Sequence, residues 1–394
     1  MRSDLVLLPP VELRDEIEEK LFLIHESIRK KSELRFLCLD KMRSLESYVD
    51  IREGSINHKH CFRACIIIRG VGCSWYNSSG CYICSYSGKQ FKRLKAIEYY
   101  EEYGKLLYDQ FVRAFKKIDW SNIPILCLYN SGSIFDPKQI PVESFIKILK
   151  TIAKTPYIYE VRIESAARHV NNDYLEILNH YIGSQKKIVI GVGLESSNEW
   201  IRNKLVNKNL QVSEFEYASS LIKNHGMELC TYVLLKPPLI SESDAIKDSV
   251  NSILYSFDQG SSTVSLEAMN IQSNTIAELL FKQGWYNPPW LWSIINVLKN
   301  VNSNCKKDQY ISIGGLRIVP QPQAYSKNCN ECTNVILKMM REYNMEHDYD
   351  TFMNKLPNCN CSNTWSKNLK LNKVASWEDW NQKLDSLLSL YRDI

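Results

Sequence analysis

The stretch FRACIIIRGVGCSWYNSSGCYIC, residues 62–84, joins a short apolar run to a loop that holds three cysteines. The run 62–70 is rich in β-branched residues and ends in glycine, a pattern typical of a buried strand. Cys73, Cys81 and Cys84 follow at spacings of seven and two residues, with neither a fourth cysteine nor a histidine close behind. Three soft ligands in one loop indicate a metal centre that keeps one coordination position open.

The residues of this loop allow more than one interpretation. The pair Cys81 and Cys84 also fits half of a zinc site or a redox dithiol, and cysteines of such a loop can lack any role. A four-iron cluster normally takes four thiolates, so three would leave one iron free to bind a chelating ligand and pass it an electron. The strand before the loop and the repeated units after it favour the redox-active cluster.

Strand-like and helix-like runs alternate from the cysteine loop onward. Each apolar strand-like run is followed by a stretch with helical spacing, which predicts six βα units. Buried parallel strands with right-handed crossovers curl into a barrel, so we expect an α/β fold with a partial (βα)6-type TIM barrel. The six strands are expected at residues 62–70, 123–133, 157–165, 186–196, 227–238 and 262–271.

Polar residues recur where these expected strands end. In parallel barrels the chemistry gathers at the carboxyl ends of the strands, where the loops meet at one rim. Glu164 and Glu195 can each serve this chemistry or instead cap the helix that follows, and Lys236 fits plain surface equally well. Besides the cysteine loop, the strand ends carry Asn130, Ser131, Gly132, Ser133, Glu164, Glu195, Lys236 and Glu267.

The chain divides into three expected regions. Residues 1–57 form an N-terminal helical extension, because apolar and charged residues are interleaved with helical spacing over 11–55. Residues 58–275 form the barrel, and residues 276–394 form a small C-terminal region that contains cysteines.

Two cysteine pairs mark the C-terminal region. Cys329, Cys332, Cys359 and Cys361 are four soft ligands without an open position, which favours a structural zinc site. Such a site would hold together an element that has little core of its own. An auxiliary iron–sulfur cluster and cysteines without metal remain alternatives, because ligand softness alone does not separate them.

Composition predicts an ordinary globular protein of the cytoplasm. Of the 394 residues, 44% are hydrophobic and 24% charged, no apolar run is long enough to span a membrane, and the N-terminus carries charges where a signal peptide needs an apolar core. Thirteen cysteines in a reducing compartment favour metal binding over disulfides. The net charge of +5 is compatible with a nucleic-acid partner. Trp285, Tyr286, Trp290 and Trp292 are more typical of a core than of a surface that stacks on bases.

A three-cysteine loop after the first barrel strand, followed by βα units, resembles the radical S-adenosylmethionine (SAM) superfamily. With the motifs YNSGSIFDP, GLES, LLKPP and PPWLW, the C-x7-C-x2-C spacing is most similar to an archaeal elongator-like group, and within it to the radical subunits of archaeosine synthases. The resemblance covers roughly residues 60–365. The spacing departs from the commonest form of the superfamily, C-x3-C-x2-C.

The resemblance implies a [4Fe-4S] cluster on Cys73, Cys81 and Cys84. It also implies that the open iron binds SAM through its amino and carboxyl groups, and that electron transfer cleaves the sulfonium to give a 5′-deoxyadenosyl radical.

The resemblance further implies which residues contact SAM. Asn130, Ser131, Gly132 and Ser133 match the turn that holds the methionyl amine, although the acidic residue usual there is absent. Glu195 matches a carboxylate that accepts the ribose hydroxyls, with Glu164 as a second candidate.

The implied substrate is a tRNA in which a partner subunit has joined lysine to a 7-deazaguanine base. Scission of a C–N bond in this lysine adduct would leave archaeosine. The implied partners are tRNA, the lysine-transferring archaeosine synthase subunit, and an electron donor such as ferredoxin or flavodoxin. Two other functions stay open: a radical SAM enzyme that acts on a small molecule or peptide, and a non-enzymatic zinc-binding scaffold.

Overall fold

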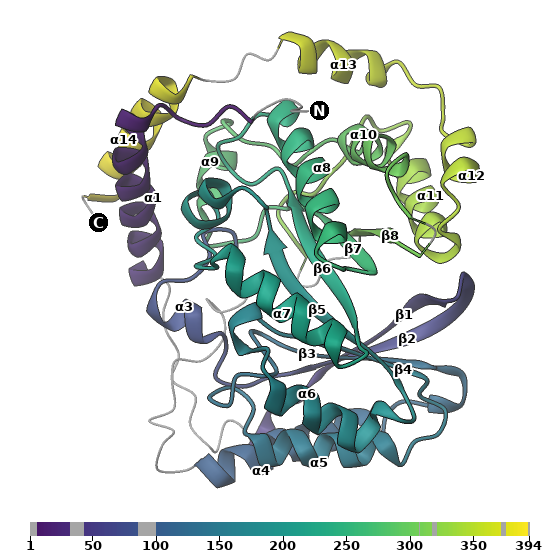
Figure 1. Ribbon diagram of the computed structural model, residues 1–394. Helices are drawn as coiled ribbons and strands as arrows, with labels where there is room; N and C mark the ends of the chain where they lie inside the picture. Colours follow the sequence, from purple (N-terminus) through teal and green to yellow (C-terminus); the bar gives the residue numbers. More distant parts are fainter. Residues whose placement is uncertain are drawn as a thin grey trace.

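The computed structural model describes residues 6–31, 43–85, 100–306, 308–316, 321–371 and 376–392. In these ranges a single sheet of eight strands curls into a half-barrel, and helices cover its outer side (Figure 1). Within the described ranges, no helix has the length and apolar character needed to cross a lipid bilayer.

The strands lie in the sheet in chain order, from β1 to β8. β1 runs antiparallel to β2, and every later pair of neighbours is parallel. The six strands expected from the sequence are confirmed as β2 to β7, and the partial TIM barrel is confirmed with them. The strands are β1 Tyr48–Ile56, β2 Lys59–Ile68, β3 Ile125–Asn130, β4 Glu160–Glu164, β5 Lys187–Glu195, β6 Glu228–Leu235, β7 Thr263–Ala268 and β8 Tyr310–Gly314.

Helices connect the parallel strands and continue beyond β8 into the C-terminal region. The helices are α1 Val11–Lys31, α3 Ser74–Ser78, α4 Tyr100–Phe115, α5 Val142–Ala153, α6 Asn172–Leu178, α7 Val212–Asn224, α8 Glu242–Asp258, α9 Ile276–Lys282, α10 Leu291–Asn302, α11 Thr333–Glu346, α12 Tyr349–Asn354, α13 Cys361–Leu371 and α14 Trp377–Arg392.

The two faces of the sheet differ in chemistry. Outward-facing residues such as Ile66, Leu128 and Ile190 belong to an apolar core that they share with the helices. Because side chains alternate along a strand, the residues between them face the barrel axis. Many of these inner residues are polar or titratable, which suits a polar ligand better than a packed core. They include Arg63, Cys65, Cys127, Tyr129, Arg162, Glu164, Cys230, Tyr232 and Glu267.

The helical prediction for residues 11–55 is correct for α1 and wrong for residues 48–56, which form β1; residues 32–42 lie outside the described part of the chain. β1 folds back on β2 through a two-residue turn, and Ile56 pairs with Lys59. Asn57 and His58 adopt φ values of 49° and 61°, the left-handed backbone that such hairpin turns need. The hydrogen bonds that pair residues 48–56 with the whole of β2 stabilise a strand here, although the weak spacing of apolar residues favoured a helix.

Helix α11 covers the open side of the half-barrel, between β8 and β1 (Figure 1). Asn344 of α11 donates its Nδ2 to the carbonyl oxygen of Ile313 and accepts the N–H of the same residue, each at 2.8 Å. These two bonds satisfy the N–H and the carbonyl group of Ile313 at the edge of β8, as a neighbouring strand would. After the helix, His347 packs against His58 and Tyr310, with ring centroids 5.6 and 5.3 Å away.

Helices α1 and α14 lie side by side although they come from opposite ends of the described chain (Figure 1). Lys20 of α1 lies 2.7 Å from a carboxylate oxygen of Asp385 in α14. On another side, α1 contacts the cysteine loop, because His25 Nε2 lies 2.9 Å from the Ser79 carbonyl oxygen. The terminal helices therefore support the cysteine loop from outside the barrel.

Arg202 organises the segment between β5 and α7, and only 1% of it is exposed. Its Nε donates to the carbonyl oxygen of Leu210 at 2.8 Å. Its Nη1 donates to the carbonyl oxygens of Ser196 at 2.9 Å and Ser197 at 3.2 Å. The guanidinium therefore satisfies backbone groups that no regular secondary structure serves.

We expect Arg202→Met to lower the free energy of unfolding by about 3 kcal/mol or more, because each buried carbonyl left without a donor costs about 1–3 kcal/mol. Urea unfolding followed by circular dichroism measures the change. Arg168→Met is the control: this arginine lies 3.9 Å from Glu214 at the surface, and its loss should cost under about 1 kcal/mol. Equal losses in the two variants would contradict the role given to Arg202.

Candidate active site at the carboxyl ends of the strands

The three-cysteine loop follows β2 at the carboxyl end of the sheet. Cys73 is the N-cap residue of α3, and Cys81 and Cys84 follow that helix, with the N–H of Cys84 donating to the Cys81 carbonyl oxygen at 3.2 Å. All three residues are partly buried. Burial raises the pKa of the Cys81 thiol, nearby Lys208 lowers it, and the thiols of Cys84 and Cys73 raise it further. The three sulfurs therefore share one electrostatic environment with a lysine.

Asn207, in the segment after β5, holds the cysteine loop in place. Its Nδ2 donates to the carbonyl oxygen of Gly80 at 2.7 Å and to Ser79 Oγ at 2.9 Å. Its own carbonyl oxygen accepts the indole N–H of Trp75 at 2.8 Å. Asn207 adopts a φ of 55°, in the left-handed region that asparagine tolerates better than most residues. One residue, through its side chain and its backbone carbonyl, therefore fixes both ends of the stretch between the first two cysteines.

The predicted NSGS turn after β3 packs directly against Cys73. A Cβ atom on Gly132 would lie 2.8 Å from the Cys73 Cα and 2.1 Å from Gln139 Oε1. Within the turn, the N–H of Gly132 donates to Asn130 Oδ1 at 3.0 Å, and the N–H of Ser133 donates to Gln139 Oε1 at 2.9 Å. Position 132 accepts only glycine because the backbone of the cysteine loop occupies the space of a side chain.

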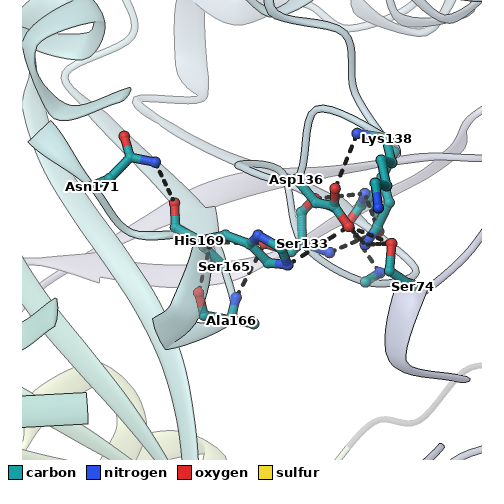
Figure 2. Close-up of polar contacts among 11 residues, drawn as sticks. Ser74, Ser133, Asp136, Lys138, Ser165, Ala166, His169 and Asn171 are labelled. Carbon is teal, nitrogen blue, oxygen red and sulfur yellow. Dashed lines mark hydrogen bonds and ion pairs between the residues drawn. The ribbon is translucent and has the colours of Figure 1, made fainter. Parts of the chain in front are cut away.

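The two serines of this turn have different surroundings. Ser133 Oγ lies 2.8 Å from Ser165 Oγ, so it joins the end of β3 to the end of β4 (Figure 2). Ser131 Oγ is buried and has no hydrogen-bond partner among the described residues. Because buried hydroxyl groups nearly always have partners, an orphaned one indicates a ligand or water at that place. Ser131 is thus the serine of the turn that fits a cofactor contact.

An acidic residue near this turn, Asp136, was not predicted from the sequence. It is 2% exposed, accepts hydrogen bonds from the Ser74 hydroxyl and from Gln139 Nε2, the latter at 2.8 Å, and lies 3.6 Å from His169 Nε2 (Figure 2). The only sequence signal is its place in the motif YNSGSIFDP. Its bonds tie the residue after Cys73 to the turn, which makes Asp136 a positioning residue.

Glu195 ends β5 and forms an ion pair that the sequence did not predict. Its Oε1 lies 2.7 Å from the Nζ of Lys208, and its φ is 66°. A Cβ atom on Gly193 would lie 2.6 Å from that Nζ, so the glycine makes room for the pair. Burial opposes the charge of Lys208, but Glu195 and the nearby Cys81 raise the lysine pKa overall. The pair places opposite charges beside the cysteine loop.

Glu164 ends β4 on the inner face of the barrel. The hydroxyl of Tyr232 donates to its Oε1 at 2.7 Å. Burial raises the pKa of this carboxyl group to about 7; the bond from Tyr232 lowers it, and Cys127 and Glu267 raise it. Neither Glu164 nor Glu195 caps the helix that follows it, because Asn171 caps α6 and Asn198 Oδ1 accepts the N–H of Ile201 at the start of the helical segment after β5.

Lys236 and the aromatic residues named from the sequence contact other parts of the fold. Lys236 pairs with Glu242 at 2.5 Å and donates to the carbonyl oxygen of Asn287 at 2.9 Å. Tyr286, in the segment before α10, and Trp292 of α10 are buried in the apolar core, as their composition favoured.

The two C-terminal cysteine pairs come together in space. The sulfur atoms of Cys329, Cys332, Cys359 and Cys361 all lie within 4.8 Å of one another. Among the described residues, no other set of three or more His, Cys, Asp or Glu side chains is gathered closely enough to hold a single metal ion. Cys73, Cys81 and Cys84 are not gathered into such a set, and an iron–sulfur cluster would bind them through three separate irons.

We expect Gly132→Ala to displace the cysteine loop, because the added methyl group meets the backbone of Cys73 as well as the Gln139 side chain, and the backbone cannot turn away. The variant should retain well under half of the iron that the wild type retains after anaerobic reconstitution, measured by a colorimetric iron assay. Gly54→Ala in β1 is the matched control, since its methyl group meets only side-chain atoms at 3.3 Å. Normal iron content in Gly132→Ala would show that the contact does not position the loop.

The pKa of Glu164 gives the protein a pH-dependent stability. The pKa of this carboxyl group is 4.5 in the unfolded chain and about 7 in the folded protein. Stability from this group is therefore complete below pH 4.5 and is lost as the pH rises toward 7 and beyond.

Glu164→Gln should remove this dependence, since the amide oxygen still accepts the Tyr232 hydrogen bond and does not ionise. Between pH 5 and pH 8 the wild type should lose on the order of 2–3 kcal/mol of unfolding free energy relative to the variant. Urea titrations at the two pH values measure it, with Glu176→Gln on exposed helix α6 as control. A constant difference between wild type and Glu164→Gln would refute the raised pKa.

No family model matches the chain. The archaeosine synthase subunit beta of Methanosarcina acetivorans is 26% identical over 309 residues, covering 78% of this chain and 84% of the relative. That of Thermococcus kodakarensis is 30% identical over 235 residues, covering 59% of this chain and 70% of the relative. Among solved structures, an N-terminally truncated Elp3 from Methanocaldococcus infernus is similar with a TM-score of 0.43 and 13% identity, covering 61% of this chain and 58% of that chain.

These two relatives match 78% and 59% of the chain, and the chain covers 84% and 70% of their own lengths. The resemblance to archaeosine synthases is confirmed, and the chain belongs to the family of archaeosine synthase beta subunits.

Proposed function

We propose that the protein is a radical SAM enzyme whose cluster is held by Cys73, Cys81 and Cys84. The observation that carries this proposal is the packing of these cysteines at the carboxyl rim of a polar half-barrel, with Cys73 against the NSGS turn and Cys81 beside Lys208. A rim where loops from several strands meet is where barrel enzymes place their chemistry. The cysteine loop is also fixed from three directions, by Asn207, Asp136 and helix α1.

We assign the contacts to SAM to the two strand ends beside the cysteine loop. The orphaned hydroxyl of Ser131 and the backbone of Asn130 and Gly132 would hold the methionyl end. Glu195 would accept the ribose hydroxyls, and its ion pair with Lys208 holds the carboxylate in one orientation. When bound, the cluster and SAM supply a 5′-deoxyadenosyl radical. Glu164 ends β4 on the inner face of the barrel, and we assign it to the substrate and not to the cofactor.

We propose that the substrate is a tRNA with lysine attached to a 7-deazaguanine base, and that cleavage of a C–N bond leaves archaeosine. The names of the two curated relatives support this assignment. The inner face of the barrel supports it as well, because Glu164 and Glu267 offer carboxyl groups that suit the ammonium group of an attached lysine. The partners would be the subunit that transfers lysine and an electron donor such as ferredoxin or flavodoxin.

Two alternatives lead to different results with the same protein. A radical SAM enzyme of small molecules or peptides would release 5′-deoxyadenosine without any stimulation by tRNA. A zinc-binding scaffold would take up no iron in the first cysteine loop. We assign the four C-terminal cysteines no part in the radical chemistry.

The test is anaerobic reconstitution with iron and sulfide, followed by assay of 5′-deoxyadenosine with lysine-modified and unmodified tRNA. We expect release that depends on the lysine-modified tRNA, and archaeosine in the digested product. Cys81→Ala should abolish both the cluster absorbance and the release, because it removes one of three iron ligands. Cys305→Ala removes a cysteine outside both sets and should leave both unchanged. Loss of the cluster to the same extent in Cys81→Ala and Cys305→Ala would contradict the assignment of Cys81 as an iron ligand.

A further inference from the structure

The geometry of the four C-terminal sulfurs identifies the kind of group they can hold. Sγ–Sγ distances are 3.4 Å for Cys329 and Cys359, 3.5 Å for Cys332 and Cys361, and 3.6 Å for Cys329 and Cys332. A disulfide would need about 2 Å, and these cysteines are free. Four sulfurs in a tetrahedron about 2.3 Å from a zinc ion are about 3.8 Å apart. The observed spacing therefore fits a single tetrahedral ion.

The same spacing disfavours an iron–sulfur cluster at this place. A four-iron cluster binds each thiolate through a different iron atom, so its four sulfur ligands lie much further apart than the ligands of one ion. All four sulfurs here lie within 4.8 Å of one another. With four protein ligands and no open position, the arrangement matches a structural site.

The surroundings of the sulfurs also fit an anionic tetrathiolate site. The indole N–H of Trp292 donates to Cys361 Sγ at 3.1 Å. The Nδ2 of Asn328 is buried without a hydrogen-bond partner among the described residues, and this amide faces Cys332. N–H groups directed at thiolate ligands stabilise the negative charge that remains after a divalent ion binds. Cys332 and Cys359 are 3% and 9% exposed, so the site is largely closed to water.

We propose that Cys329, Cys332, Cys359 and Cys361 bind one Zn²⁺ ion, and that this ion locks helix α11 over the open side of the half-barrel. The cysteines lie where α11 and α13 begin, so the ion joins the starts of two helices. The opposite end of α11 holds the barrel edges through Asn344 and His347. The bond from Trp292 adds α10 to the same anchor. This site stands independently of the proposed radical chemistry.

The first test is zinc analysis of protein purified without added iron. We expect about one zinc ion per chain in the wild type and in a Cys73→Ala/Cys81→Ala/Cys84→Ala variant, so that failure of the first cysteine loop leaves this result intact. Cys359→Ser/Cys361→Ser should lose the zinc, and Cys305→Ser should keep it. Wild type without zinc, or zinc retained in Cys359→Ser/Cys361→Ser, would overturn the proposal.

Iron counting separates zinc from a second cluster. After anaerobic reconstitution we expect about four irons per chain in the wild type and in Cys359→Ser/Cys361→Ser, whereas an auxiliary cluster would give about eight in the wild type and four in the variant. If Cys359→Ser/Cys361→Ser does not fold, the wild type alone still tests the proposal. With Co²⁺ in place of zinc, the wild type should show the intense absorption of a tetrahedral tetrathiolate site. A weak octahedral spectrum would overturn the proposal.

Hydrogen–deuterium exchange of the wild type tests the lock. Removal of zinc by a thiol-directed mercurial should speed exchange at least tenfold in α11 (residues 333–346) and β8 (residues 310–314), because α11 loses its anchored end and β8 its edge partner. Exchange in α5 (residues 142–153), which lies on the far side of the barrel, should stay unchanged. Unaltered protection of α11 after complete zinc removal would show that the ion does not hold this helix.

Discussion

The close contact between Gly132 and Cys73 is the constraint on which the candidate site depends. It exists because parallel strands β2 and β3 end side by side, so that the loops after them share one space at the rim. With no side chain at position 132, the two backbones come near enough for Asp136 and Gln139 to bond across to Ser74. These bonds attach the cysteine loop firmly to the end of the sheet.

The sheet itself needs support, because a half-barrel has two open edges and a polar interior. β1 covers one edge as an antiparallel partner, and α11 covers the other through Asn344. The polar interior cannot contribute the apolar packing of an ordinary barrel. That packing comes from the outer helices and from the contact between α1 and α14. The inner face of the strands therefore serves the candidate site, and their outer face serves the stability of the fold.

The sequence predicts the parallel strands β2 to β7 because each contains apolar residues and is followed by a stretch with helical spacing, whereas the parallel strand β8 was not among the six expected. The sequence predicts the cysteines because ligand spacing is local and does not depend on distant contacts. β1 escaped prediction because Asp50, Arg52 and Glu53 interrupt its apolar pattern and a turn without glycine sets its pairing. Asn207 and Lys208 escaped prediction because they belong to no motif, and only the left-handed backbone of the segment after β5 brings them to the cysteines.

The open coordination position of the cluster is tested most directly by electron paramagnetic resonance of the reduced, reconstituted protein with and without SAM. If Cys73, Cys81 and Cys84 leave one iron without a protein ligand, addition of SAM should change the g-values of the cluster signal, since the cofactor then becomes a ligand. A signal that stays identical at saturating SAM would contradict a three-cysteine cluster with an exchangeable iron.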